Sequence, residues 1–130
     1  MSEELPGMNN CPCGLGEPYD ECCGRYHRGE EPPSAELLMR ARYSAYVVGD
    51  RKFLLRTWHE KTRPRAFSLE EEQNWLGLTI LGREGGGLLD SEGIVEFRAR
   101  YVADGRRGAM HDRSRFVKVG GAWRYLDEIA

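Results

Sequence analysis

Four cysteines, the only ones in this chain of 130 residues, lie within thirteen consecutive positions. They follow the pattern Cys11-x-Cys13, then eight intervening residues, then Cys22-Cys23. Cysteines that merely fill a core are scattered along a chain, so this clustering indicates a site. A zinc ion binds four thiolates at the corners of a tetrahedron, and a segment of fewer than about 40 residues usually needs a metal or disulfides to fold. The pattern therefore predicts one structural zinc ion held by Cys11, Cys13, Cys22 and Cys23.

Other uses of these cysteines agree less well with the sequence. Two disulfides would require an oxidising compartment, but the chain begins with Met1-Ser-Glu-Glu-Leu-Pro6, which lacks the basic and apolar parts of a signal peptide. We therefore expect a cytoplasmic protein with reduced thiols. A catalytic zinc site keeps one position open for water, whereas four cysteines fill every position. His27, four residues beyond Cys23, is an alternative ligand, although we expect it to be a surface histidine.

Composition and charge narrow the classes of function. The formal net charge is −2, which argues against a general nucleic-acid binder but leaves room for a local basic patch. No apolar run approaches the roughly 20 residues that a membrane-spanning helix needs. Glycine and proline are dense in the cysteine segment, which indicates turns. We expect a flexible N-terminus over residues 1–10, a zinc-binding module over 11–28 and a larger globular domain over 34–130.

Three capping signals follow the cysteine segment. Ser34 and Asp50 are both suitable N-caps, and Ser68-Leu-Glu-Glu71 fits a capping box. Gly49 provides a suitable stop for the first of these helices. The signals predict helices over residues 35–48, 51–58 and 69–75.

The second half of the chain changes to the period of β-strands. Apolar and polar residues alternate from Val95 to Tyr101, and Asp104-Gly105 and Gly120-Gly121 are typical hairpin turns. Long strands are expected over residues 107–119 and 122–129. Helices followed by an antiparallel meander predict an α+β fold in which the helices cover one face of the sheet.

Two-residue turns at both hairpins would fix the register of the sheet. The first turn places Phe97 opposite Asp112, which would then face the helices. The second turn places Phe116 opposite Tyr125, and Ser114 opposite Asp127. A one-residue slip or a bulge would instead turn three basic residues inward: His111, Arg113 and Arg115.

One charged residue interrupts the apolar face of the first helix and suggests a pocket. Arg42 lies on this face and needs a partner or a water-filled cavity; alternatively its stem packs while its head reaches solvent. Together with Asp112, and near Tyr46 and Trp58, Arg42 would form a polar centre in an apolar cavity, as in small-molecule sites. His59, which directly follows Trp58 in the sequence, is a candidate general base.

The remaining charged residues have simpler interpretations. Glu96, Arg113 and Glu128 would form a row on the outer face of the sheet, with Arg98 beside His111, as a solvated ladder of ion pairs. Three positive charges between Lys61 and Arg65 form either a phosphate-contacting loop or a solvated loop.

Residues 11–24, Cys-Pro-Cys-Gly-Leu-Gly-Glu-Pro-Tyr-Asp-Glu-Cys-Cys-Gly, resemble a SEC-C motif, the small zinc-binding module at the C-terminus of the SecA preprotein translocase motor. Four further parts of the chain resemble the uncharacterised YchJ-like family. The resemblance implies a fold similar to nuclear transport factor 2, in which helices form a cone on a curved sheet. The segments that carry it are Ala35–Tyr46, Thr57–His59, Met110–Phe116 and Trp123–Tyr125.

The resemblance also implies a class of function. In SecA the motif is associated with binding of the SecB chaperone and the ribosome, so we expect a non-enzymatic adaptor whose partner is a chaperone, translocation or ribosomal protein. Several family members carry a second SEC-C motif, whereas no cysteine follows Cys23 here. The alternatives are a small-molecule binder, or an enzyme of the hydrolase or isomerase type, using the cavity of the cone. RNA binding is a third hypothesis, and the acidic net charge counts against it.

Overall fold

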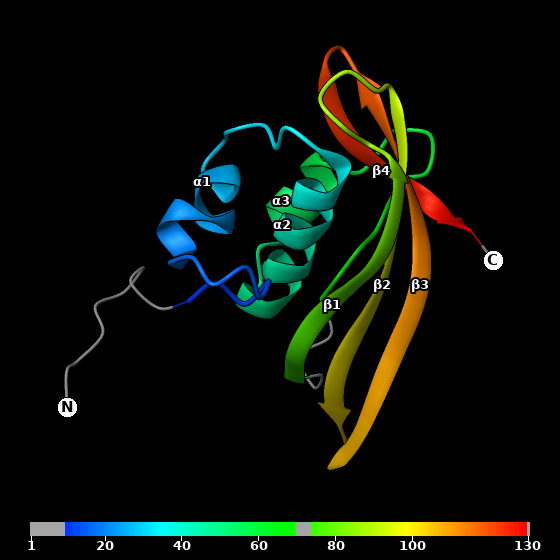
Figure 1. Ribbon diagram of the computed structural model, residues 1–130. Coiled ribbons are helices and arrows are strands. Elements are labelled where there is room, and N and C mark those ends of the chain that lie inside the picture. Colours follow the sequence, from blue (N-terminus) through cyan, green and yellow to red (C-terminus); the bar gives the residue numbers. More distant parts are fainter. Residues whose placement is uncertain (1–9, 70–73, 130) are drawn as a thin grey trace.

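The computed structural model describes residues 10–69 and 74–129 (Figure 1). Four strands form one antiparallel sheet in the order β1-β2-β3-β4, so each strand pairs with its neighbour in sequence. The predicted α+β fold with a meander is therefore confirmed. The elements in chain order are η1 (Tyr19–Glu21), α1 (Cys23–His27), α2 (Ala35–Val48), α3 (Arg51–Arg56), β1 (Asn74–Gly85), β2 (Glu92–Ala103), β3 (Arg106–Val119) and β4 (Ala122–Ile129).

Local capping determines both ends of α2, which has the predicted bounds. The Ser34 hydroxyl accepts a hydrogen bond from the backbone N–H of Leu37, at 3.1 Å. At the other end Gly49 adopts the left-handed conformation, with φ of 81°, and its N–H donates to the carbonyl of Ala45. A glycine is favoured there because a Cβ would strain this backbone.

Helix α3 begins as predicted but ends at Arg56, two residues earlier than expected. The Asp50 carboxylate accepts from the N–H of Phe53, at 3.0 Å, and so caps the helix. After the helix, the chain pairs with β4: the Tyr125 N–H donates to the Thr57 carbonyl and the His59 N–H donates to the Tyr125 carbonyl. These bonds compete with helix continuation, which explains the earlier end.

The predicted third helix over 69–75 is wrong at its described C-terminal end. Residues 70–73 lie outside the described part of the chain, and β1 already begins at Asn74. Trp75 pairs with Tyr101 of β2, and its ring packs edge-on against Tyr43 of α2. Long-range packing of this ring therefore overrides a local capping signal.

The register of β2 and β3 is the predicted one, with Phe97 opposite Asp112. Between β3 and β4 the pairing of Phe116 with Tyr125 is also confirmed, but a bulge follows it. Ser114 consequently faces Glu128 rather than Asp127. Because a bulge adds one residue to one strand, the side chains of β4 beyond it exchange faces.

Three layers are visible in Figure 1: the N-terminal segment with α1, the pair α2 and α3, and the curved sheet. Helix α2 contacts α1 and α3 as well as β1, β2 and β4. The largest fully buried side chains include Phe53 of α3, Phe116 of β3 and Trp123 of β4. The four cysteines belong to the same continuous buried cluster. Within the described residues, no helix is long and apolar enough to cross a membrane.

Candidate metal centre and ligand cavity

A tight loop and the start of α1 bring the four cysteines together. The N–H of Cys11 donates to the carbonyl of Glu17, at 2.8 Å, which closes the loop, and the N–H of Gly14 donates back to Cys11. Cys22 and Cys23 lie at the N-terminus of α1, directly after η1. The sequence signal therefore identified the residues that the fold juxtaposes.

The geometry of the four sulfurs suits a tetrahedral metal ion. All four Sγ atoms lie within 4.8 Å of one another and all four residues are buried. The Sγ atoms of Cys13 and Cys22 are 3.6 Å apart, while thiolates bound to one ion at about 2.3 Å stand about 3.8 Å from one another. The cysteines form no disulfides. The donor set thus fits one metal ion with four sulfur ligands.

Electrostatics in this cluster also favour a cation. Hydrogen bonds from the thiols of Cys13 and then Cys23 lower the pKa of Cys11. Burial raises the pKa of Cys22 to about 12, and the negative charges of Cys13 and Cys11 add to this effect. The protein alone therefore does not stabilise four thiolates in this space. A divalent ion held by the four sulfurs would supply the missing positive charge and would favour the deprotonated form of each ligand.

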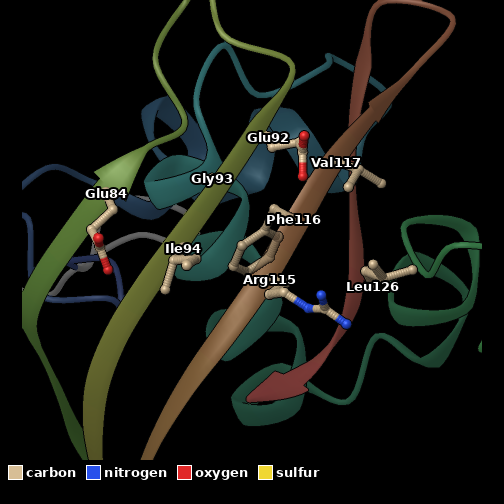
Figure 2. A pocket seen from close by; sticks show the side chains of 8 residues that line it. All are labelled: Glu84, Glu92, Gly93, Ile94, Arg115, Phe116, Val117 and Leu126. Carbon is tan, nitrogen blue, oxygen red and sulfur yellow. The ribbon is translucent and has the colours of Figure 1, made fainter.

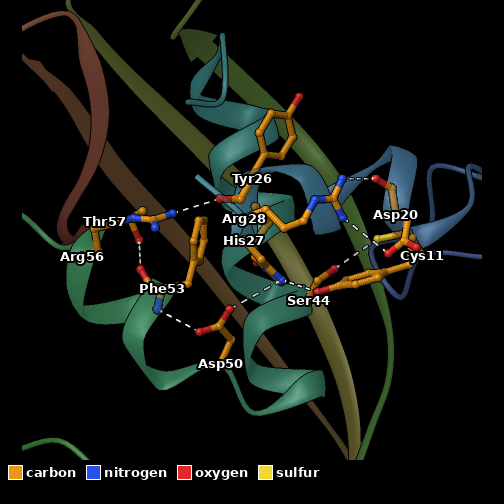
Figure 3. Close-up of polar contacts among 12 residues, drawn as sticks. Cys11, Asp20, Tyr26, His27, Arg28, Ser44, Asp50, Phe53, Arg56 and Thr57 are labelled. Carbon is orange, nitrogen blue, oxygen red and sulfur yellow. Dashed lines mark hydrogen bonds and ion pairs between the residues drawn. The ribbon is translucent and has the colours of Figure 1, made fainter. Parts of the chain in front are cut away.

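Helix α2 provides the surroundings of the cluster. The Sγ of Cys11 lies 3.4 Å from the Ser44 hydroxyl (Figure 3). Arg40, one turn earlier, donates through Nη1 to the carbonyl of Cys13, at 2.7 Å. The sulfur of Cys11 and the backbone of Cys13 therefore attach the cysteine segment to α2.

The side chain of His27 points into the protein, so the expected surface histidine is wrong. Its side chain is 5% exposed. Nε2 lies 2.8 Å from the carbonyl of Ala41, and Nδ1 lies 2.5 Å from the hydroxyl of Tyr19. A carbonyl only accepts, so Nε2 carries the hydrogen and Nδ1 accepts from Tyr19. Burial raises the pKa of Tyr19 to about 12, with a further contribution from Asp50, which keeps this donor protonated. His27 thus joins α1 to α2 and is not part of the sulfur cluster.

A second site lies on the opposite side of α2, facing the sheet. It is a partly open cavity of about 380 Å³. Two methionines and an alanine complete a lining that is dominated by aromatic rings, and Arg42, Ser114 and Glu128 supply its polar groups. The rings belong to Tyr43, Tyr46, Trp58, Trp75, Phe97 and Tyr125.

Arg42 lies at the buried end of this cavity and is only 4% exposed. Its Nη1 donates to the carbonyl of Leu54 and to the hydroxyl of Thr57, both at 2.8 Å. Its Cζ lies 4.5 Å from the ring centre of Tyr125 and 5.1 Å from that of Trp58. Burial lowers the pKa of Arg42 to about 10, so it remains charged at neutral pH. The head of this arginine therefore lies inside the protein, at the wall of the cavity, and not on the outer surface.

The structure brings together only part of the predicted pocket. Tyr46 and Trp58 line it with Arg42, whereas Asp112 and His59 are not among its described lining residues. The ring Nδ1 of His59 instead accepts from the N–H of Lys61, at 3.0 Å. Among the described residues, no carboxylate forms an ion pair with Arg42, so the predicted Arg42–Asp112 pair is wrong.

Glu128 is the cavity residue that sequence reasoning missed. The bulge in β4 moves it from the predicted outer row to the face that bears the cavity. Glu128 is exposed, so it lies at the open end; partial burial of its carboxyl and, after it, the charge of Asp112 raise its pKa. No feature of the sequence near Tyr125 identifies this bulge.

Some of the ion pairs predicted for the outer face of the sheet are present. Glu96 contacts both His111, at 2.6 Å, and Arg113, at 4.0 Å. A shallow hollow of about 160 Å³ on this face is lined by residues that include Ile94 and Arg115 (Figure 2). Arg115 already forms a two-pronged pair with Asp127, at 2.7 and 2.6 Å. This hollow therefore offers no free cation to a ligand.

Comparisons with known proteins agree with this architecture. The family model described as the YchJ middle NTF2-like domain matches residues 34–128. A UPF0225 protein of Streptomyces avermitilis is 50% identical over 123 residues, which cover 94% of this chain and 85% of that protein. Another, from Streptomyces coelicolor, is 50% identical over 118 residues, covering 90% of this chain and 92% of that protein.

Two solved structures are also similar. A SEC-C motif containing protein from Rhodopseudomonas palustris is 36% identical, with a TM-score of 0.81, and the match covers 94% of this chain and 98% of that one. A SEC-C motif containing protein from Psychrobacter arcticus is 26% identical, with a TM-score of 0.76, over 93% and 82% of the two chains. The chain therefore belongs to the YchJ-like UPF0225 family, and its larger domain has the fold of nuclear transport factor 2.

Proposed function

We propose that this protein binds a small organic molecule in the cavity between α2 and the sheet, and that a zinc ion on the four cysteines stabilises the fold that forms this cavity. The observation that carries the proposal is a buried, charged Arg42 at the closed end of a space of about 380 Å³. Ligand sites commonly have volumes of about 300–1,000 Å³ and mostly apolar walls with a few placed polar groups.

The arrangement supports binding better than catalysis. Among the described lining residues, Glu128 is the candidate acid or base, and it is exposed and forms no ion pair with Arg42. Ser114 of β3 pairs with Glu128 of the neighbouring strand β4, but no histidine is among the described lining residues. A nucleophile is ordinarily activated by an adjacent base, so a hydrolase mechanism has less support here than a receptor or carrier role.

The metal is assigned as zinc on ligand chemistry. Four thiolates in a tetrahedral arrangement select zinc or an iron–sulfur cluster, and a closed set of four protein ligands is typical of structural zinc. The buried position of the sulfurs against Ser44 and the Cys13–Arg40 contact agree with a structural role. Elemental analysis of protein purified without chelator tests this assignment, with one zinc per chain as the expected result.

The three tryptophans provide a direct test of binding. The indole of Trp58 lines the cavity, as does that of Trp75, whereas Trp123 is buried in the core outside it. We expect a bound small molecule to shift the indole N–H resonances of Trp58 and Trp75 in an NMR titration and to leave Trp123 unchanged. A fragment library in which no compound moves the two cavity indoles selectively would refute the proposed function.

A second candidate function is the adaptor role that the SEC-C resemblance implies. The loop between Cys13 and Cys22 presents Leu15, which is 44% exposed, between Gly14 and Gly16. Both glycines have positive φ, 88° and 87°, so the turn that carries this apolar side chain is well defined. Such an exposed apolar side chain suits a contact with a protein partner of the chaperone, translocation or ribosomal class.

Ribosome co-sedimentation tests the adaptor role. Leu15→Asp should abolish co-sedimentation if this loop is the contact. Leu89→Asp is the matched control, because Leu89 is 96% exposed in the loop between β1 and β2. Equal co-sedimentation of the two variants would contradict the adaptor role. The role would also be contradicted if the unmodified protein neither co-sedimented with ribosomes nor formed a complex with a purified chaperone.

A further inference from the structure

The guanidinium of Arg42 retains hydrogen-bonding capacity that its protein partners do not use. Arginine has five N–H donors, and both of the contacts described for Arg42 come from Nη1. Nε and Nη2 have no partner among the described residues. The fully buried side-chain atoms without a partner there are two indole nitrogens, those of Trp58 and Trp123. Nε and Nη2 are not among them, so these donors keep access to the cavity.

The charge of Arg42 is also incompletely compensated. Two rings cover the guanidinium, since its Cζ lies 4.5 Å from Tyr125 and 5.1 Å from Trp58. Such cation–π contacts compensate a buried charge only in part. Among the described residues no carboxylate lies within 4.0 Å of it, although burial of an unpaired charge is costly. An anion in the cavity would provide the missing partner.

The free edge of the guanidinium specifies the geometry of that anion. Nε and Nη2 present two parallel N–H groups, which match the two oxygens of a carboxylate. A phosphate dianion would bring two charges to the one cation of the described lining, with Glu128 at the open end adding repulsion. A singly charged carboxylate is therefore the better match.

The remaining lining describes the body and the far end of the ligand. Six aromatic rings form the walls, which favours a flat apolar body stacked between them. Glu128 faces Ser114 across the two strands at the exposed end. When ionised, a carboxylate only accepts hydrogen bonds, so this end favours a ligand that carries a hydroxyl or amine donor.

We infer that the cavity binds a flat, largely apolar monocarboxylate, with its carboxylate paired to Arg42 and a hydrogen-bond donor directed towards Glu128. This inference rests on the proposed small-molecule function and specifies its ligand class. Arg42 is then the residue that determines specificity for charge, and the aromatic walls determine specificity for shape.

The test compares probes that differ in one group each. trans-Cinnamate, its neutral amide and 4-hydroxycinnamate are titrated into the zinc-loaded protein, with calorimetry for affinity and the indole resonances of Trp58 and Trp75 for location. We expect the acid to bind at least tenfold more tightly than the amide. The 4-hydroxy acid should bind several-fold more tightly than cinnamate, and Glu128→Gln should reduce this second preference only.

Variants provide a second measurement. Arg42→Met should remove the preference for acid over amide, while Arg115→Gln, which removes the same charge from the outer face, should keep it. If Arg42→Met does not fold, the ratio of the affinities of the unmodified protein for the acid and the amide still tests the carboxylate inference. Equal binding of acid and amide would overturn the carboxylate inference and leave the proposed function standing. If a broad library that includes neutral compounds also fails to shift the cavity indoles, the proposed function itself fails.

Discussion

Removal of the metal should destabilise the larger domain and not only the segment that carries the cysteines. The N-terminal segment and α2 share one buried cluster, and Tyr26 of α1 is only 2% exposed within it. Four polar contacts join the segment to the helices: Cys11 with Ser44, Arg40 with the Cys13 carbonyl, His27 with the Ala41 carbonyl, and Arg56 with the Tyr26 carbonyl.

These contacts determine how much free energy of unfolding should be lost when the metal is removed. A hydrogen bond contributes about 0.5–1.5 kcal/mol net, so four of them contribute about 2–6 kcal/mol. Burial of an aromatic ring such as that of Tyr26 adds about 1.5–3 kcal/mol. A domain of this kind has a total unfolding free energy of about 5–15 kcal/mol. Loss of at least about 2 kcal/mol corresponds to a fall of about 1 M in the urea midpoint for ordinary slopes.

Tryptophan fluorescence can follow the unfolding of the larger domain. All three tryptophans, Trp58, Trp75 and Trp123, lie beyond the metal-binding segment, so tryptophan fluorescence reports the helices and the sheet. Urea unfolding is compared for zinc-loaded and chelated protein, with metal content measured in both. Cys22→Ser is the control, because it already lacks one ligand and should show little further change on chelation. An unchanged tryptophan midpoint after verified metal removal would refute the reasoning.

Three further predictions concern capping, packing and pH. Ser34→Ala removes the acceptor for the Leu37 N–H and should cost about 0.5–2 kcal/mol in urea unfolding, without a change in ligand binding. Gly93→Ala should cost about 1–3 kcal/mol in the same assay, because its Cβ would lie 2.5 Å from the Cα of Gly86; an unchanged midpoint would show that the backbone at Gly86 moves away without cost. Burial raises the pKa of Tyr125 to about 12, against 10.0 ordinarily. The contribution of Tyr125 to the free energy of unfolding should therefore be constant below pH 10 and fall as pH rises towards 12, and Tyr125→Phe should make the alkaline fall in stability shallower.

Signals that act over a few residues predicted their parts of the fold correctly. Ser34 and Gly49 delimit α2 through bonds to neighbours within four residues, which is why its bounds follow from the sequence. The Asp104-Gly105 turn similarly fixes the register of β2 and β3, since a two-residue hairpin determines every later pair. The spacing of the cysteines identified the sulfur cluster for the same reason.

Features that depend on distant contacts were not predictable. The start of β1 is stabilised by Trp75 packing on Tyr43 of α2, more than thirty positions away, against a local signal for helix. The bulge after Tyr125 coincides with its bonds to the segment that follows α3. Glu128 enters the cavity only because of this bulge. Alternation along β4 alone places it on the outer face, so the polar partner across the cavity could not be identified.

Helix α2 explains why the metal centre and the cavity occur in one domain. Ser44 and Arg40 face the cysteine segment, whereas Arg42 and Tyr46 face the cavity, so the two sites use opposite faces of one helix. A helix buried on both sides has little freedom to rotate, since any rotation would break contacts on each face. The N–H donors on Nε and Nη2 of Arg42 can bind a ligand well only if they are held in a fixed direction. A metal ion on the cysteine segment would therefore support the proposed ligand site by fixing the helix that carries Arg42.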